Sequence, residues 1–189
     1  FVSDENMPIK ESYPLNPVNP YAISKKSQEE IGLYYFKQFG LNLYFTRTFH
    51  CTGPYQPIGF VCSDIAKQVV SVERGISSSI KIGNLEAKRD FTDIRDVVEG
   101  YWQIVNEGAP GQIYNVCFGK SISIQNILDK LIVFSGRNIP TIVDKSKLRK
   151  SDVPDFIGCN SKLKNIGWTP KFTIEQSLED LLSWIRAGD

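Results

Sequence analysis

Segments with helical patterns alternate with short runs of β-branched and aromatic residues along this chain of 189 residues, and this alternation restricts its fold more than any other feature. Such alternation is typical of proteins in which helices cover a sheet. Strands are predicted at residues 43–49, 80–82, 113–117 and 140–143. Helices are predicted at residues 20–38, 59–74, 93–106, 123–134 and 173–184, and polar loops at residues 84–89 and 145–154. The sequence therefore predicts an α/β fold.

Several predicted helices have capping residues at their ends. The pair Asn19-Pro20 is a strong helix start, because asparagine caps free N–H groups and proline fits the first helical position. Gly40 fits the end of the same helix. Thr173 and Gln176 have the spacing of a capping box and are predicted to open the last helix.

Composition excludes several classes of function. The net charge is +1, from 22 basic and 21 acidic residues, which argues against a nucleic-acid-binding surface. The four cysteines are far apart and there is one histidine, so neither a zinc site nor a disulfide framework is predicted. No apolar run approaches the length of a membrane span. We therefore expect a cytoplasmic protein that does not contact a membrane.

Tyr21 and Lys25 are one turn apart at the start of the first predicted helix, so their side chains project from the same face. An ammonium group beside a phenol favours the phenolate and lowers the tyrosine pKa from its reference of about 10. A tyrosine tuned in this way can give a proton to a carbonyl oxygen or take one from an alcohol. The alternative is an exposed lysine on a helix whose tyrosine packs against a neighbour.

Four segments in order resemble the extended short-chain dehydrogenase/reductase family, also called the epimerase/dehydratase family, over residues 14–184. These segments are residues 17–25 (PVNPYAISK), 83–97 (GNLEAKRDFTDIRDV), 148–153 (LRKSDV) and 166–170 (IGWTP). The resemblance implies the C-terminal part of a Rossmann-type fold with a small α/β substrate-binding domain. Residues 1–55 would be the remnant of the NAD(P)-binding domain. Residues 56–189 would be mainly the substrate domain, with some segments returning to the Rossmann sheet.

The resemblance also implies roles for individual residues. Tyr21 and Lys25 would be the catalytic pair and would contact the cofactor, NADP or NAD. Arg89 and Arg149 would hold the diphosphate of a nucleotide sugar, because a guanidinium donates two parallel hydrogen bonds to phosphate oxygens. For Arg89 the alternative is a salt bridge with Asp90 or Asp93, and Arg149 has the same kind of alternative.

Two further residues are weaker candidates. His50 is a candidate contact to the cofactor ribose or the sugar, and its alternative is a hydrogen-bonded histidine at a strand end. Asn84 is a candidate nucleotide contact, but Gly83-Asn84 is also an ordinary turn, which we favour. The helix over residues 21–38 is predicted to carry a homodimer interface, as two such helices often pair in this family.

Within the family, residues 59–68 and 114–117 resemble reductases of GDP-4-keto-6-deoxy-mannose, which make GDP-rhamnose. Residues 50–56 (HCTGPYQ) lack the glutamate and arginines typical of the sister GDP-mannose 4,6-dehydratases. The expected function is reduction of a GDP-4-keto-6-deoxyhexose with NAD(P)H, and a 4,6-dehydratase or a nucleotide-sugar 4-epimerase remains an alternative.

An alternative of another class is a non-catalytic fragment that binds a nucleotide sugar or only dimerises. It rests on one absence, because no glycine-rich turn of the kind that cradles a dinucleotide pyrophosphate follows any predicted strand. The first nineteen positions form a loop rich in proline that starts at Phe1, so we expect the sequence to be part of a longer enzyme.

Overall fold

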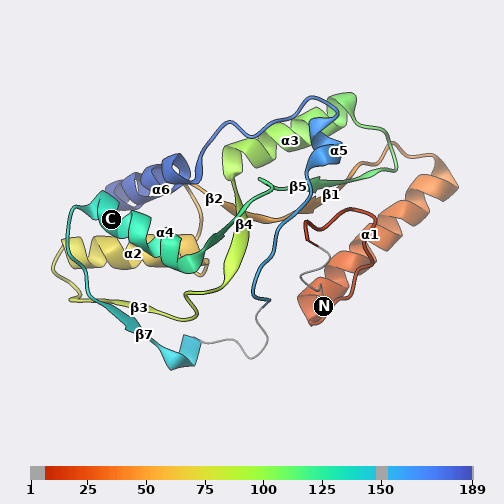
Figure 1. Cartoon of the computed structure of the whole chain (residues 1–189). Helices are drawn as coiled ribbons and strands as arrows, with labels where there is room; N and C mark the ends of the chain where they lie inside the picture. The colour runs from red at the N-terminus through yellow and green to blue at the C-terminus, as the bar shows by residue number, and fades with distance from the viewer. Residues whose placement is uncertain (1–6, 148–152, 189) are drawn as a thin grey trace.

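The computed structural model describes residues 7–147 and 153–188, and it has the α/β architecture that the sequence predicts (Figure 1). The helices are α1 (Pro20–Phe39), α2 (Val61–Glu73), α3 (Ile94–Glu107), α4 (Ile124–Ser135), α5 (Ser161–Lys164) and α6 (Ile174–Gly188). The strands are β1 (Phe45–Thr48), β2 (His50–Thr52), β3 (Ile80–Ile82), β4 (Lys88–Asp93), β5 (Ile113–Val116), β6 (Ser121–Ser123) and β7 (Thr141–Val143).

The strands form three small sheets in which parallel pairing dominates. β1 pairs with β5, β3 pairs with β7, and β2 pairs with β4, all in parallel, whereas β6 is antiparallel to β4. Parallel pairs require long crossover connections, and here these contain the helices. Figure 1 shows α2, α4 and α6 together at one end of the molecule, with α1 at the other end beyond the β1–β5 pair.

The core is divided between two clusters of buried side chains. The larger one joins α2, α4 and α6 to β3, and includes Ile65, Leu128 and Leu182. The smaller one joins α3 to β5 and α5 through Val97, Ile104, Val116, Leu163 and Trp168. Both helix and strand side chains enter each cluster, so the short strands are held in place by the helices that cover them.

Helix α1 begins and ends where the sequence predicts. The Asn19 side chain accepts a hydrogen bond from the backbone N–H of Ala22 at 2.8 Å, and Gly40 adopts the left-handed conformation with φ of 64°. The helix has no buried residue. It is fixed to β1 by a pair of hydrogen bonds from Arg47 to the Glu29 carboxylate, at 2.9 and 2.7 Å. This ion pair orients the helix and therefore Tyr21 in its first turn.

The loop predicted at residues 84–89 is wrong in its last two residues, because β4 begins at Lys88. The charged run Lys88-Arg89-Asp90 has no local pattern of a strand. Its backbone forms hydrogen bonds with a distant part of the chain. The N–H groups of Lys88 and Asp90 donate to the carbonyl oxygens of Pro154 and Phe156, respectively. β6 was also not predicted, and the strand predicted at residues 43–49 is replaced by β1 and β2.

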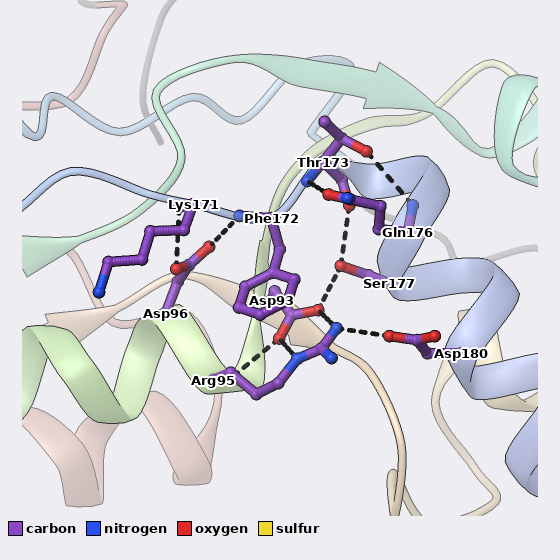
Figure 2. Close-up of polar contacts among 9 residues, drawn as sticks. All are labelled: Asp93, Arg95, Asp96, Lys171, Phe172, Thr173, Gln176, Ser177 and Asp180. Atoms are coloured by element: carbon purple, nitrogen blue, oxygen red, sulfur yellow. Dashed lines mark hydrogen bonds and ion pairs between the residues drawn. The ribbon is translucent and has the colours of Figure 1, made fainter.

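The junction between β4 and α3 is tied to α6 by buried carboxylates (Figure 2). Asp93 caps α3 and accepts a hydrogen bond from the Ser177 hydroxyl of α6. Asp96 accepts the backbone N–H groups of Lys171 and Phe172, at 2.9 and 3.0 Å. The predicted capping box is confirmed, because the Thr173 N–H donates to the Gln176 side chain at 2.8 Å and the Gln176 N–H to the Thr173 hydroxyl at 3.3 Å.

Within residues 7–147 and 153–188, no helix combines the length and the apolar character needed to cross a bilayer. Over the same ranges, histidine, cysteine, aspartate and glutamate side chains do not gather in a group able to hold a metal ion.

Candidate active site

A large open cleft, about 1280 Å³ in volume, lies where α1, the β1–β2 segment, the start of α2, β3 and β4 meet. We call it the central cleft. Of the residues predicted to be functional, four line it: Tyr21, His50, Asn84 and Arg89. They come from three separate parts of the chain, since Asn84 and Arg89 are close in sequence, and the fold brings this part together with Tyr21 and His50.

Tyr21 stands at the start of α1 with 71% of its surface exposed, and it lines the central cleft. The ammonium nitrogen of Lys25 lies 5.9 Å from the centre of the Tyr21 ring and donates to the Gln28 side chain at 3.2 Å. The two side chains therefore share one face of the helix. The exposure of Tyr21 does not fit the alternative in which its ring packs against a neighbour.

Arg89 lies on β4, half-buried, in the wall of the cleft. One of its guanidinium nitrogens donates to the carbonyl oxygens of Lys88 and Val153, at 2.6 and 2.7 Å. The two carboxylates weighed as alternative partners are engaged elsewhere. Asp90 accepts backbone N–H groups, and Asp93 is paired with Arg95.

His50 opens β2, directly opposite Phe91 of β4. Its ring centre lies 5.6 Å from that of Phe91 and 6.0 Å from that of Phe156. All three residues line the cleft, so His50 is part of an aromatic wall beside Arg89. Sequence reasoning did not find Phe156, because no local motif marks an isolated aromatic residue in an irregular segment.

Asn84 follows the carboxyl end of β3, and its side-chain oxygen accepts the N–H of Glu86 at 3.0 Å. The turn that we favoured from the sequence is therefore present, and the same residue also lines the cleft. The preceding Gly83 has no room for a side chain. A Cβ atom there would lie 2.8 Å from the carbonyl oxygen of Lys147.

Arg149 lies outside the described residues, so the structure does not place it. Its neighbour Lys147 is described and lines the cleft, and its ammonium group donates to the carbonyl oxygen of Lys81 at 2.9 Å. Lys81 also lines the cleft. Neither lysine was singled out as a site residue in the sequence, although Lys147 belongs to the basic run that contains Arg149.

The charges that line the cleft favour an anionic ligand. Arg89, Lys81 and Lys147 contribute positive charge, and among the lining residues that the structure describes, Asp64 alone carries a carboxylate. Asp64 accepts the N–H of Gly59 at 2.7 Å, which fixes the loop that leads into α2. Several fixed cations facing one cavity raise the local concentration of an anion.

Parallel strand pairs with helices in their connections make the chain an α/β protein, and its likeness to solved structures assigns it to the Rossmann type. Its fold matches solved members of the short-chain dehydrogenase/reductase and epimerase class. RMD from Pseudomonas aeruginosa, complexed with NADPH, matches with a TM-score of 0.95 and 29% identity over 100% of this chain and 63% of that one. dTDP-glucose 4,6-dehydratase from Bacillus anthracis, in complex with NAD, matches with a TM-score of 0.80 and 25% identity, over 94% and 55% of the two chains.

Residues 2–181 match the family described as GDP-mannose 4,6 dehydratase, and the chain belongs to this family. It is 30% identical to GDP-6-deoxy-D-mannose reductase of Pseudomonas aeruginosa over 96% of this chain and 60% of the relative. It is 28% identical to a GDP-mannose 4,6-dehydratase of Sordaria araneosa, over 96% of this chain and 37% of that relative. The chain thus spans 60% or less of the length of these two relatives.

Proposed function

We propose that this chain is part of a nucleotide-sugar oxidoreductase that reduces the 4-keto group of a GDP-4-keto-6-deoxyhexose with NAD(P)H, giving a product such as GDP-rhamnose. The observation that carries the proposal is that Tyr21 of α1 and Arg89 of β4 line one cleft. A proton donor and a phosphate-binding guanidinium facing the same cavity suit a ligand with a reactive sugar at one end and a diphosphate further along.

In this proposal the Tyr21 hydroxyl donates its proton to the C4 oxygen of the hexose, and general acid catalysis of this kind contributes about 10²–10⁴-fold to a rate. NAD(P)H, when bound, supplies the hydride. Lys25 stabilises the phenolate left on Tyr21 through its positive charge. Lys25 would also hold the ribose of a bound cofactor by donating hydrogen bonds to its hydroxyls.

The residues present fit one end of such a cofactor. Tyr21 and Lys25 are both exposed at the start of α1, where a ribose can reach the phenol and the ammonium group. The sequence has no glycine-rich turn between a strand and a helix, so its own residues fit the nicotinamide ribose and not the pyrophosphate. The NADPH and NAD bound in the two solved relatives support a dinucleotide cofactor.

Arg89 is proposed to bind the substrate diphosphate, with Arg149 as a second contact and Lys81 and Lys147 as further positive charges. A guanidinium is suited to this task because it donates two parallel hydrogen bonds. His50 and Asn84 line the same cleft and are proposed to contact the cofactor and the nucleotide, respectively.

The proposal extends to the organisation of the protein. Residues 1–55 are assigned to the cofactor domain and residues 56–189 mainly to the substrate domain. A homodimer through α1 is supported by large apolar side chains that are exposed on or beside this helix: Ile23, Ile31, Tyr34, Tyr35, Phe39 and Leu41. The free state of all four cysteines is compatible with the reducing cytoplasm.

Two substrates distinguish the proposed reductase from a 4,6-dehydratase. We expect the full-length protein to oxidise NADPH with GDP-4-keto-6-deoxy-mannose, with a product two mass units heavier than this substrate. Loss of water from GDP-mannose in the presence of NADP⁺ would identify a 4,6-dehydratase instead. Binding of GDP without turnover of either substrate would leave two alternatives, a nucleotide-sugar 4-epimerase and a non-catalytic fragment that binds a nucleotide sugar.

A further inference from the structure

Strand β4 presents its side chains alternately to two sides, as strands do. Arg89 and Phe91 line the central cleft, whereas Asp90 between them does not. Asp90 is fully buried, at 0% exposure. A buried carboxylate is costly unless it is well satisfied, so the groups around it indicate why it is there.

The Asp90 carboxylate accepts three backbone N–H groups from two other segments. One oxygen accepts from Phe118 at 2.9 Å, and the other accepts from Gly119 at 2.9 Å and from Gly158 at 3.1 Å. Burial raises the pKa of Asp90 to about 6, against the lowering effect of these hydrogen bonds. All three neighbours are N–H donors, so the surroundings suit an ionised carboxylate, which only accepts hydrogen bonds.

The segment that ends at Gly158 forms part of the cleft. Its Val153 carbonyl oxygen accepts the hydrogen bond from the Arg89 guanidinium at 2.7 Å. Its Phe156 ring lies 5.1 Å from the Phe49 ring, and both residues line the cleft. The position of this segment therefore determines where the guanidinium and the aromatic wall lie.

Gly158 leaves little freedom for another arrangement. A Cβ atom at this position would lie 2.5 Å from the Cys117 sulfur and 2.7 Å from the Phe49 ring. The amide group of Asn160 donates to the carbonyl oxygens of Cys117 and Phe118, at 2.9 and 2.8 Å. The turn after β5 is thus held by two side chains, those of Asp90 and Asn160.

We propose that Asp90 is a positioning residue for ligand binding: it fixes β4 against the 118–119 turn and Gly158, and so holds Arg89 and Phe156 in place for a nucleoside diphosphate. This inference rests on the proposed function of the cleft. An aspartate is needed because all three neighbours are donors. An asparagine of the same size would direct its own N–H groups at one or more of them.

The test compares Asp90→Asn with Asp96→Asn, using calorimetric titration with GDP and the melting temperature. Both changes remove an acceptor from a buried carboxylate that receives backbone N–H groups, but Asp96 holds Lys171 and Phe172, which do not line the cleft. We expect Asp90→Asn to raise the Kd for GDP about tenfold, and Asp96→Asn to leave it within about twofold of the wild type.

The outcomes separate this inference from the proposed function. If the wild type binds GDP and Asp90→Asn binds it equally well, the positioning role is overturned and the proposed function stands. If the wild type does not bind GDP, the proposed function of the cleft fails.

A second measurement needs no variant, in case Asp90→Asn does not fold. We expect GDP to slow amide hydrogen exchange at Phe118, Gly119 and Gly158 by a larger factor than at Lys171 and Phe172. Equal factors at the two sets would mean that the Asp90 contacts are not coupled to the cleft.

Discussion

Asp93 accepts hydrogen bonds from Arg95 through both of its carboxylate oxygens, although the two residues are separated by a single position (Figure 2). One oxygen accepts from the Arg95 backbone N–H and from Nε, each at 2.8 Å, and the other accepts from Nη2 at 2.8 Å. Arg95 also pairs with Asp180 of α6 at 2.8 Å. Asp93 is therefore the last residue of β4 and the cap of α3, and its carboxylate helps to join this strand and this helix to α6.

This arrangement predicts acid sensitivity. Burial acts to raise the pKa of Asp93, but hydrogen bonds from Arg95 and Ser177 outweigh it and hold the pKa below its ordinary value. Because the pKa is lower in the folded protein, the unfolded chain binds the proton first as the pH falls. The stabilisation from Asp93 should therefore be complete above the ordinary aspartate pKa, about 4, and be lost below it.

The measurement is the melting temperature of the wild type and of Asp93→Asn between about pH 2.5 and 7. We expect Asp93→Asn to cost about 1–3 kcal/mol at pH 7, and the difference between the two proteins to shrink below about pH 4. If the two melting temperatures differ by the same amount at every pH in this range, the pKa of Asp93 is not lowered by folding.

Tyr21→Phe tests the proposed proton donor. We expect kcat for GDP-4-keto-6-deoxy-mannose in the full-length protein to fall by about 10²–10⁴-fold, with no change in melting temperature, because the Tyr21 hydroxyl is exposed. Tyr13→Phe is the control, since it removes a phenolic hydroxyl at a position that neither lines the cleft nor belongs to the proposed dimer interface. Equal activity of the two variants would remove Tyr21 from the proton-transfer step.

Arg89→Ala tests the proposed diphosphate contact. A lost charge-assisted hydrogen bond to phosphate should raise the Kd for GDP by about tenfold or more. Arg137→Ala removes an arginine that does not line the cleft, and we expect its Kd to match the wild type. If adding salt weakens GDP binding equally in the wild type and in Arg89→Ala, Arg89 does not pair with the phosphates.

The first helix and the capping box could be predicted from the sequence because their signals are local. Asn19, Gly40, Thr173 and Gln176 each act within one turn of their own position. β4 could not be predicted, because its charged residues are satisfied by segments far along the chain, such as residues 154–158.

The candidate site shows the same division between local and distant signals. Motif resemblance indicated Tyr21, Lys25, Arg89 and Asn84 as candidates, but it gave no reason to include Phe156 or Lys81. These two side chains reach the cleft only through the packing of β3 and of the 153–158 segment. Their contribution depends on tertiary contacts that no short pattern in the sequence encodes.

Gly83→Ala tests the close approach at the edge of the cleft. The added Cβ would lie 2.8 Å from the backbone carbonyl oxygen of Lys147, so the short 3₁₀ helix Lys145–Lys147 or the end of β3 must shift. We expect a loss of about 1–3 kcal/mol in the free energy of unfolding, together with weaker GDP binding, because Asn84 and Lys147 also line the cleft. Gly188→Ala is the control, since nothing lies within 4 Å of its added Cβ. Denaturant unfolding and calorimetry on the two variants measure both effects, and a Gly83→Ala protein as stable as Gly188→Ala would show that the Lys147 backbone moves at little cost.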